Sequence, residues 1–287
     1  MILDYLPSSL RHLLWNVRIF ALRLKIRLNR LRSQEEVFRF TCNICGGISV
    51  SPLNLVKNRE APSCTSCGSN RRFRSIIYVL LKELTGRESK LVEIEEQKQL
   101  SGMGLSDANV YAAGLSKKFD YTNTYYHKEP QLDITSVKPD RHESVDFIIS
   151  SDVFEHIPVP VETAFDNLYK TLKKNGLCVF SVPYKLDGTT EEHFPDLYEY
   201  HIESAHGKTI LVNKTQEGQV QKFESLRFHG GPGATLEMRL FSLNDLIENM
   251  KNAGFTDIKI HLENVPEFGV LIEENTRSHI ISMRKPE

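Results

Sequence analysis

The chain has 287 residues, of which 40% are hydrophobic and 25% are charged. This is the composition of a globular protein that is long enough for one large core and a small module beside it. The net charge of -1 conceals an asymmetry, because residues 1–32 carry seven Lys or Arg and one acid, which leaves 29 basic and 36 acidic residues in the body. A body this acidic binds a phosphate backbone poorly, so the composition disfavours nucleic acid as a partner.

The basic N-terminal segment, residues 1–36, has the pattern of an amphipathic helix. Apolar residues recur at three- and four-residue spacing, and basic residues recur every seven positions at Arg11, Arg18, Lys25 and Arg32. Its uncharged runs are far shorter than the ~20 residues that span a bilayer, and no small-residue cleavage site follows, which argues against a transmembrane helix and a signal peptide. Two interpretations remain: residues 8–32 contact an anionic membrane surface, or they pack on the protein or a second subunit. We expect a cytoplasmic protein, with any membrane contact peripheral.

Four of the five cysteines form a pattern that is typical of a structural zinc site. The sequence reads CNIC, then an 18-residue spacer, then CTSC, with the cysteines at Cys42, Cys45, Cys64 and Cys67. Two such knuckles bring four thiolates into a tetrahedron, and the adjacent glycines let the backbone turn around the ion. Two disulfides are the alternative, but the odd fifth cysteine, Cys178, and the absence of an export signal disfavour it. We therefore predict a zinc ribbon over residues 37–72 that takes no part in catalysis, since four protein ligands leave no open position.

Three arginines follow the ribbon, at Arg71, Arg72 and Arg74, and they begin a predicted amphipathic helix that ends at Gly86. They suit either a phosphate or carboxylate ligand or the solvated first turn of a helix, and we favour the solvated turn.

From residue 97 onward, strand and helix patterns alternate. We predict strands near 98–104, 119–124, 145–150 and 177–183, with helices near 107–117 and 160–174. Apolar strands separated by helices indicate a parallel sheet covered on both faces, and ligands bind beyond the carboxyl ends of such strands. The strand at 145–150 ends in Ser151 and Asp152, followed by Glu155 and His156. These polar residues are therefore expected at the rim of a ligand site.

The C-terminal pattern is a helix that begins after Ser242, followed by strands near 256–262 and 278–284. It predicts a final hairpin. The fold class is then α/β, a Rossmann-like, mostly parallel sheet with a C-terminal antiparallel hairpin, preceded by a small zinc ribbon and an N-terminal amphipathic helix. This large domain spans residues 73–287, with insertions at the carboxyl edge over 185–240.

The segment VDFIISSDVFEHIPVPVETAFDNLYKTLKKNGLCVFSVP resembles the run of strand, LEH, helix, LKPGG turn and strand in class I S-adenosylmethionine-dependent methyltransferases of the type 11-like group. VFEH stands for LEH, and LKKNG stands for the turn. The resemblance covers roughly residues 40–284, and a cysteine-rich ribbon before the domain is found in one subgroup. It implies a methyltransferase that uses S-adenosylmethionine as its methyl donor.

The resemblance also implies a set of donor-binding residues. The family's G-x-G-x-G loop is represented only by GMGLSD, and the carboxylate that often ends the second strand is replaced by an amide and a hydroxyl. Asp133 matches the position that accepts a hydrogen bond from the adenine amino group, with Ile134 against the ring. The implied donor-binding residues are Gly102, Gly104, Ser106, Asp107, Asn123, Thr124, Asp133, Ile134, Ser151 and Asp152. The alternative is ordinary turn chemistry for the glycines and Asp133, and a satisfied capping pair for Glu155 and His156.

Methyl transfer from a sulfonium is an in-line displacement, so the protein mainly positions the acceptor and removes a proton from a hydroxyl. Histidine is the natural base, and we predict His229 and His156 as candidates, with His229 beside a glycine-rich turn that admits a substrate. The expected acceptor is a small molecule or a sugar hydroxyl of a surface glycan. Three alternatives are an RNA methyltransferase that uses the ribbon for recognition, a non-catalytic cofactor-binding protein, and a zinc-dependent interaction protein.

Overall fold

We describe a computed structural model for residues 36–205, 208–229, 235–273 and 276–287, together with Val17, Phe20, Ala21 and Leu24. The rest of the predicted leader helix and the glycine-rich turn after His229 lie outside the described residues. The chain forms two compact units. The first comprises Met1–Leu100, Asp107–Thr122 and His261–Thr276, and the second comprises Ser101–Ser106, Asn123–Ile260 and Arg277–Glu287. The predicted boundaries at residues 36 and 72 do not coincide with this division.

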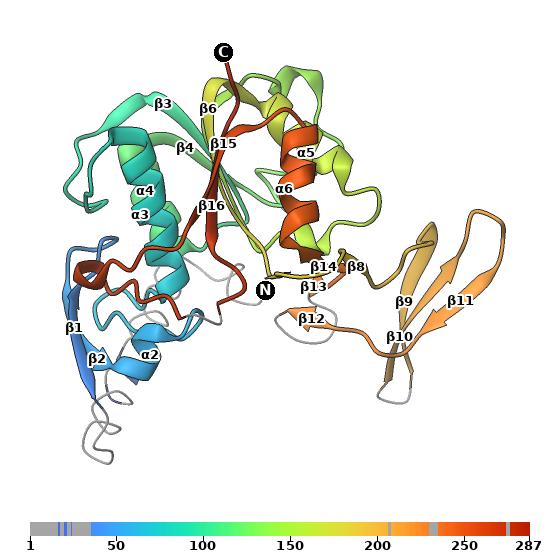
Figure 1. Cartoon of the computed structure of the whole chain (residues 1–287), viewed down its shortest axis with the longest axis horizontal. Coiled ribbons are helices and arrows are strands. Elements are labelled where there is room, and N and C mark those ends of the chain that lie inside the picture. Colours follow the sequence, from blue (N-terminus) through green and yellow to red (C-terminus); the bar gives the residue numbers. More distant parts are fainter. Residues whose placement is uncertain are drawn as a thin grey trace. The chain divides into compact units, whose positions relative to one another are not determined.

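A six-stranded sheet has the order β15-β16-β6-β5-β3-β4 (Figure 1). Its strands are β3 (Gln97–Leu105), β4 (Phe119–Thr124), β5 (Val145–Ser151), β6 (Leu172–Ser181), β15 (Thr256–His261) and β16 (Ile280–Arg284). β5 pairs in parallel with β3 and β6, whereas β16 pairs antiparallel with β6. The predicted α/β class, with a mostly parallel sheet and an antiparallel C-terminal strand, is confirmed. Every predicted strand of this domain exists.

Two helices pack on this sheet within the second unit, α5 (Glu162–Thr171) and α6 (Leu243–Asn252). Their apolar residues, spaced three or four apart, join one buried cluster with residues of β5 and β6, and include Ala164, Phe165, Leu168, Leu246 and Met250. The Ser242 hydroxyl caps α6 by accepting a hydrogen bond from the backbone N–H of Asp245 at 3.1 Å. The predicted helix of residues 160–174 is too long. The chain is already in β6 at Leu172, and the LKKNG stretch, which contains Asn175 at φ +61°, is an irregular start of that strand rather than a separate turn.

The insertion between β6 and α6 is built from short strands. They are β7 (Tyr184–Lys185), β8 (Glu191–Glu192), β9 (Glu199–Ala205), β10 (Lys208–Lys214), β11 (Val220–Phe223), β12 (Phe228–His229), β13 (Thr235–Leu236) and β14 (Arg239–Ser242). β9, β10 and β11 form an antiparallel sheet (Figure 1). β14 pairs with β7 and β8. The buried Asn213 amide ties the antiparallel sheet to the preceding loop, because it donates to the Asp196 carbonyl at 2.8 Å and accepts from the Tyr198 N–H at 2.9 Å.

The first unit contains the hairpin β1 (Val37–Thr41) and β2 (Ile48–Pro52), and the helices α2 (Leu53–Lys57), α3 (Arg71–Thr85) and α4 (Asn109–Lys118). Asn70 caps α3 by accepting from the Phe73 N–H at 2.9 Å, and Gly86 ends it in the left-handed conformation. Short 3₁₀ turns are η2 (Pro139–Arg141), η3 (Phe154–His156) and η4 (Pro266–Phe268). Among the described residues, no helix has the length and apolar character needed to cross a membrane.

Candidate functional site

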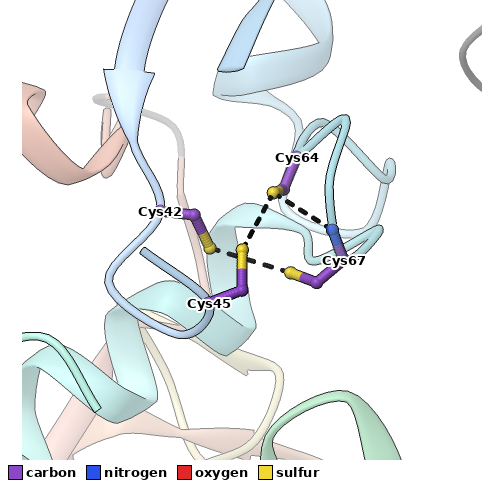
Figure 2. A group of neighbouring side chains, drawn as sticks. All are labelled: Cys42, Cys45, Cys64 and Cys67. Atoms are coloured by element: carbon purple, nitrogen blue, oxygen red, sulfur yellow. Dashed lines mark hydrogen bonds between the residues drawn. The ribbon is translucent and has the colours of Figure 1, made fainter. Parts of the chain in front are cut away.

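The four predicted zinc cysteines lie together in the first unit, with their sulfur atoms directed at a common centre (Figure 2). The Sγ atoms of Cys42 and Cys67 are 3.8 Å apart, and those of Cys45 and Cys64 are 3.7 Å apart. Four thiolates on one zinc ion, with Zn–S bonds of ~2.3 Å and tetrahedral angles, would be ~3.8 Å apart. The sulfur spacing therefore fits a tetrahedral zinc ion, and none of the four cysteines forms a disulfide in the structure.

Two glycines explain how each C-x-x-C segment turns around this centre. Gly46 (φ +72°) donates its N–H to the Cys42 carbonyl at 2.8 Å, and Gly68 (φ +74°) donates to the Cys64 carbonyl at 2.9 Å. Side chains with a Cβ rarely adopt this left-handed conformation, so glycine is required one position after the second cysteine of each pair. The two turns are thus built alike, as the sequence predicts.

Arg74 does not lie in a solvated first turn. Its side chain is buried, and its guanidinium donates to the Ser69 carbonyl at 3.0 Å and the Gly269 carbonyl at 2.9 Å. Burial lowers the pKa of Arg74, while the nearby cysteine thiolates oppose this shift. Arg71 is also buried, and Arg72 is paired with Glu60 at 2.7 Å, so the prediction of a solvated arginine cluster is wrong. The physical reason is that these arginines join the cysteine segment to the rest of the first unit.

Gly102 and Gly104 lie inside β3, where they pair with Phe147 and Ile149 of β5. A Cβ on Gly102 would lie 2.1 Å from the ring of Phe147, so this glycine makes room for a core side chain. The sharp turn out of β3 is made by Ser106, which has φ +60° although it is not glycine, and whose N–H donates to the Thr124 carbonyl at 2.8 Å. The turn expected from a glycine loop is therefore present without a glycine.

The other predicted donor-binding residues at the ends of these strands form hydrogen bonds with neighbouring protein groups. Thr124 is buried and donates its hydroxyl to the Gly104 carbonyl at 2.8 Å, and the Asn123 amide donates to the Tyr125 hydroxyl at 3.0 Å. Asp107, in the first unit, is buried and accepts hydrogen bonds from Tyr111 and Tyr121. Burial raises the pKa of Asp107 to about 7, although both tyrosines act against this shift.

Asp133 lies in a tight turn of the second unit. Its Oδ1 accepts from the Thr135 N–H at 2.9 Å and from the Thr135 hydroxyl at 2.7 Å. These hydrogen bonds are those of an ordinary turn, in which an Asp side chain binds the backbone two residues further on. They also hold the carboxylate of Asp133 in one orientation. Ile134 is buried in the core, and its carbonyl accepts from the Asn167 amide at 2.9 Å.

The carboxyl ends of β5 and β6 share a polar network. The hydroxyls of Ser151 and Ser181 are 2.9 Å apart, and Ser181 donates to the Asp152 carboxylate at 3.3 Å. Asp152 has φ +54° and is held by its N–H, which donates to the Ser181 carbonyl at 2.8 Å. A non-glycine residue in this conformation is uncommon and often marks a functional site. Ser181 was not predicted, since it ends an apolar strand and no further polar residue follows to mark it.

Glu155 and His156, which follow β5, lie close to the predicted His229. The rings of His156 and His229 are 4.7 Å apart, centre to centre, and nearly perpendicular. The carboxylate of Glu155 faces both rings, with Oε1 3.8 Å from Nε2 of His156 and 3.7 Å from Nδ1 of His229. Glu155 is fully buried, and burial lowers the pKa of His156. The two histidines predicted as base candidates therefore lie in one cluster with Glu155.

Residues 85–260 match a family described as a methyltransferase domain, which is more than half of the chain. The chain belongs to this methyltransferase family. The match confirms the expectation of a class I S-adenosylmethionine-dependent methyltransferase that rests on the VFEH and LKKNG segments. No curated protein matches the sequence.

Solved structures resemble this methyltransferase at low sequence identity. One is a 1,6-didemethyltoxoflavin-N1-methyltransferase from Burkholderia thailandensis, with 12% identity and a TM-score of 0.40, over 73% of this chain and 76% of that one. Another is an S-adenosylmethionine-dependent methyltransferase from Clostridium acetobutylicum, with 13% identity and a TM-score of 0.40, over 73% of this chain and 97% of that one.

A second layer of side chains fixes the histidine cluster of the methyltransferase. The Leu236 carbonyl accepts from Nδ1 of His156 at 2.9 Å. Glu237 accepts from Nε2 of His229 and from Nε2 of His193, each at 2.9 Å. Burial raises the pKa of Glu237, but the two histidines outweigh it and hold the pKa below its ordinary value. Glu237 was not predicted, because a single acid in the segment TLEMR carries no distinguishing pattern.

Arg239 positions the turn that carries Glu155 and His156. Its side chain is fully buried, and its guanidinium donates to the carbonyls of Phe154 and Ile157, which flank the two residues, and to the Glu192 carboxylate. The Met238 N–H also donates to the Glu155 carbonyl at 2.7 Å. The insertion thus binds directly to the turn after β5.

Proposed function

We propose that this methyltransferase transfers the methyl group of S-adenosylmethionine to a hydroxyl of a sugar, as in a surface glycan. The observation that carries the proposal is the position of the Glu155, His156 and His229 cluster just beyond the carboxyl end of β5, beside Asp152, whose charge acts on His156. In an α/β sheet this is the edge at which ligands bind. A methyl acceptor placed here meets groups that can accept or hold a proton.

The residues around the ends of β3 and β5 fit the donor. The Ser106 turn exposes backbone beyond β3, and Asp133 and Asp152 hold carboxylates in fixed orientations. We assign the adenine amino group to Asp133, and the remaining donor contacts to Ser106, Ser151 and Asp152. Gly102 and Thr124 contribute by shaping β3 and β4 rather than by contact, because their surroundings are protein atoms.

S-Adenosylmethionine supplies an electrophilic methyl group on a positively charged sulfur. The protein has to bring an acceptor oxygen into line with that carbon and to accommodate the proton which the oxygen loses. His156 and His229 provide nitrogen atoms at this position, and Glu237 and the Leu236 carbonyl fix their rings. This orientation by a second layer is what a catalytic histidine requires.

Exposed tyrosines support a sugar as the acceptor. Tyr200 lies in β9 and Tyr198 directly precedes this strand, and their exposed fractions are 39% and 59%. Tyr126, after β4, is 68% exposed and lies close enough to Tyr200 to influence its pKa, which burial raises. Tyrosine combines a flat apolar face with a hydroxyl, which suits a ligand that is apolar on one face and rich in hydroxyls at its edge.

The four cysteines support a structural zinc ion in the first unit. Cys42, Cys45, Cys64 and Cys67 would hold it with their thiolates, because their sulfur spacing agrees with a tetrahedral site. Metal analysis of the purified protein should find one zinc ion per chain at these cysteines. Cys42→Ser should lose it, whereas Cys178→Ser, which alters a buried cysteine in β6, should retain it. Zinc content that is absent from the wild type, or unaffected by Cys42→Ser, contradicts the ribbon.

The leader supports contact with an anionic membrane. Val17, Phe20, Ala21 and Leu24 have helical conformation and are spaced as one helix face, and the exposed fractions of Val17, Phe20 and Leu24 are 54%, 67% and 47%. Exposure of this apolar face disfavours packing on the chain itself. The basic residues of the segment give it the opposite charge to an anionic lipid surface.

The acceptor class is tested by supplying S-adenosylmethionine with a labelled methyl group and separate acceptors: oligosaccharides, nucleotide sugars, RNA and protein. We expect the label to be transferred to a sugar. The double variant Tyr198→Ala, Tyr200→Ala should raise KM for that sugar and leave the affinity for S-adenosylmethionine unchanged. The matched control is Tyr78→Phe, which alters a buried tyrosine of α3 in the first unit. Label that enters RNA alone, or protein alone, contradicts the sugar acceptor.

A further inference from the structure

Glu155, His156 and His229 each offer one atom that could bind a metal ion, and these three atoms all lie within 4.8 Å of one another. The separations from Glu155 Oε1 are 3.8 Å to Nε2 of His156 and 3.7 Å to Nδ1 of His229. Both are too long for a good hydrogen bond. They are close to the ~3.4 to 3.7 Å that separates two ligands at tetrahedral to trigonal angles on an ion with bonds of ~2.1 Å.

The hydrogen bonds on the far side of each ring determine which nitrogen faces the centre as a lone pair. A carbonyl oxygen can only accept, so Nδ1 of His156 donates to Leu236. In the same way Nε2 of His229 donates to the Glu237 carboxylate. With one proton on each ring, Nε2 of His156 and Nδ1 of His229 present lone pairs toward Glu155 Oε1. Three electron-rich atoms then face one another, an arrangement that a cation between them stabilises.

The surroundings of this cluster are those of a metal centre. Histidine ligands usually donate their other N–H to a carbonyl or carboxylate, which fixes ring orientation and tautomer. Both histidines do so here, one to Leu236 and the other to Glu237. Glu155 is fully buried, so bulk water does not reach its carboxylate. Arg239 adds rigidity, because it binds the backbone carbonyls on both sides of the Glu155–His156 pair.

We propose that Glu155, His156 and His229 bind one divalent first-row transition metal ion, separate from the ion at the four cysteines. Two imidazoles and a carboxylate suit Mn²⁺, Fe²⁺, Co²⁺ or Zn²⁺ better than Mg²⁺ or Ca²⁺, which prefer oxygen ligands. Three protein ligands leave at least one coordination position open, in contrast to the closed set of four cysteines.

The open position is suited to an oxygen ligand, and the role assigned to it rests on the proposed function. The hydroxyl oxygen of the acceptor binds the ion, which lowers the pKa of that hydroxyl. The hydroxyl proton leaves to water, the oxygen forms a bond to the methyl carbon, and the electron pair of the broken carbon–sulfur bond stays on sulfur. With the ion bound, the two histidines act as its ligands, and this role replaces the general-base role that the proposed function gives them.

The site is tested by titrating full-length protein with Mn²⁺. Electron paramagnetic resonance detects binding as a loss of the signal of free Mn²⁺. Mn²⁺ is a suitable probe because the thiolates of the cysteine site favour softer ions. We expect one Mn²⁺ per chain, a weakening of at least about tenfold in His229→Ala, and a smaller weakening in Glu237→Gln, which alters only the ring support. His229 is partly exposed, so its replacement should leave the fold intact, as circular dichroism would verify.

The matched control is His201→Ala, which removes an exposed histidine whose Nε2 lies 2.8 Å from Glu203 in the same insertion. It should bind Mn²⁺ like the wild type. No binding of Mn²⁺, Co²⁺ or Zn²⁺ beyond the cysteine site, or equal binding by His229→Ala, would overturn the proposal. Calorimetry with S-adenosylmethionine distinguishes the metal proposal from the proposed function. Binding of the donor without binding of a metal ion refutes only the metal site. Binding of a metal ion without binding of the donor refutes only the donor assignment.

Discussion

Asp107 shows at the residue scale how burial changes a side chain that the sequence indicates as a ligand. Its carboxylate accepts from two tyrosines, and burial raises its pKa to about 7. Because the folded-state pKa lies above the unfolded value of ~3.9, the folded state holds an extra proton between these two values. The stability that this proton provides is complete below pH ~4 and is lost as the pH rises to ~7.

We therefore expect the free energy of unfolding of the wild type, relative to Asp107→Asn, to fall by up to about 4 kcal/mol between pH ~4 and pH ~8. The asparagine cannot ionise, so the difference isolates this one group. Urea unfolding of both proteins at several pH values measures it. A difference that stays constant with pH would mean that Asp107 is charged in the folded protein throughout.

Asp133 is the residue on which the adenine assignment depends. Asp133→Ala should weaken S-adenosylmethionine binding by ~1 to 3 kcal/mol, since the adenine amino group loses its acceptor. Isothermal calorimetry measures the change, with Asp140→Ala on η2 as a control for the loss of a carboxylate. Thr135→Val removes one hydrogen bond of the Asp133 turn but keeps the carboxylate. If Thr135→Val weakens binding as much as Asp133→Ala does, the carboxylate supports only the turn.

At the scale of elements, η3 and β14 depend on each other through Arg239. Arg239→Met removes the donors to the Phe154 and Ile157 carbonyls and leaves Glu192 without its buried partner. Breaking such a pair typically costs ~3 to 5 kcal/mol of stability. We expect a loss of this size in urea unfolding, compared with less than ~1 kcal/mol for Arg227→Met, whose arginine is mostly exposed. Equal, small effects of the two substitutions would show that Arg239 does not hold η3.

The elements of the sheet are predictable from the sequence because their residues are apolar in unbroken runs. Phe147, Ile148 and Ile149 are fully buried in β5, and the predicted strand 119–124 agrees with β4 at both ends. The start of β6 is not predictable, since Lys173, Lys174 and Asn175 look like a turn and lie in an irregularity between the paired residues Leu172 and Leu177. Strand existence follows from local pattern, whereas this boundary depends on tertiary contacts.

The candidate site is predictable only in part for a similar reason. Asp152, Glu155 and His156 follow an apolar strand directly, so the sequence alone places them at the sheet edge. His193, Glu237 and Arg239 reach the same cluster through the short strands of the insertion, whose pairing has no clear period in the sequence. For Gly102 the sequence motif is misleading. The motif predicts a ligand-binding loop, whereas the glycine is needed because the ring of Phe147 packs against it.

At the scale of the whole molecule, the basic leader and the acidic body predict an oriented attachment to a surface. Full-length protein should sediment with anionic liposomes, and a version without residues 1–32 should not, since each basic residue near the surface adds ~1 kcal/mol. High salt should weaken the binding, because the surface field is screened over ~8 Å at physiological ionic strength. Neutral liposomes are the control. Equal, negligible sedimentation of both proteins contradicts membrane contact, and a deletion that converts dimers to monomers would indicate a subunit interface.

Binding of the methyl donor is the property on which the roles of the sheet edge and the histidine cluster both depend. Calorimetric titration of the purified full-length protein with S-adenosylmethionine tests it most directly. We predict saturable binding at one site per chain, and binding of S-adenosylhomocysteine at the same site. If the protein is folded, as judged by its cooperative unfolding, yet gives no binding heat and no thermal stabilisation with either compound, it is not an S-adenosylmethionine-dependent methyltransferase.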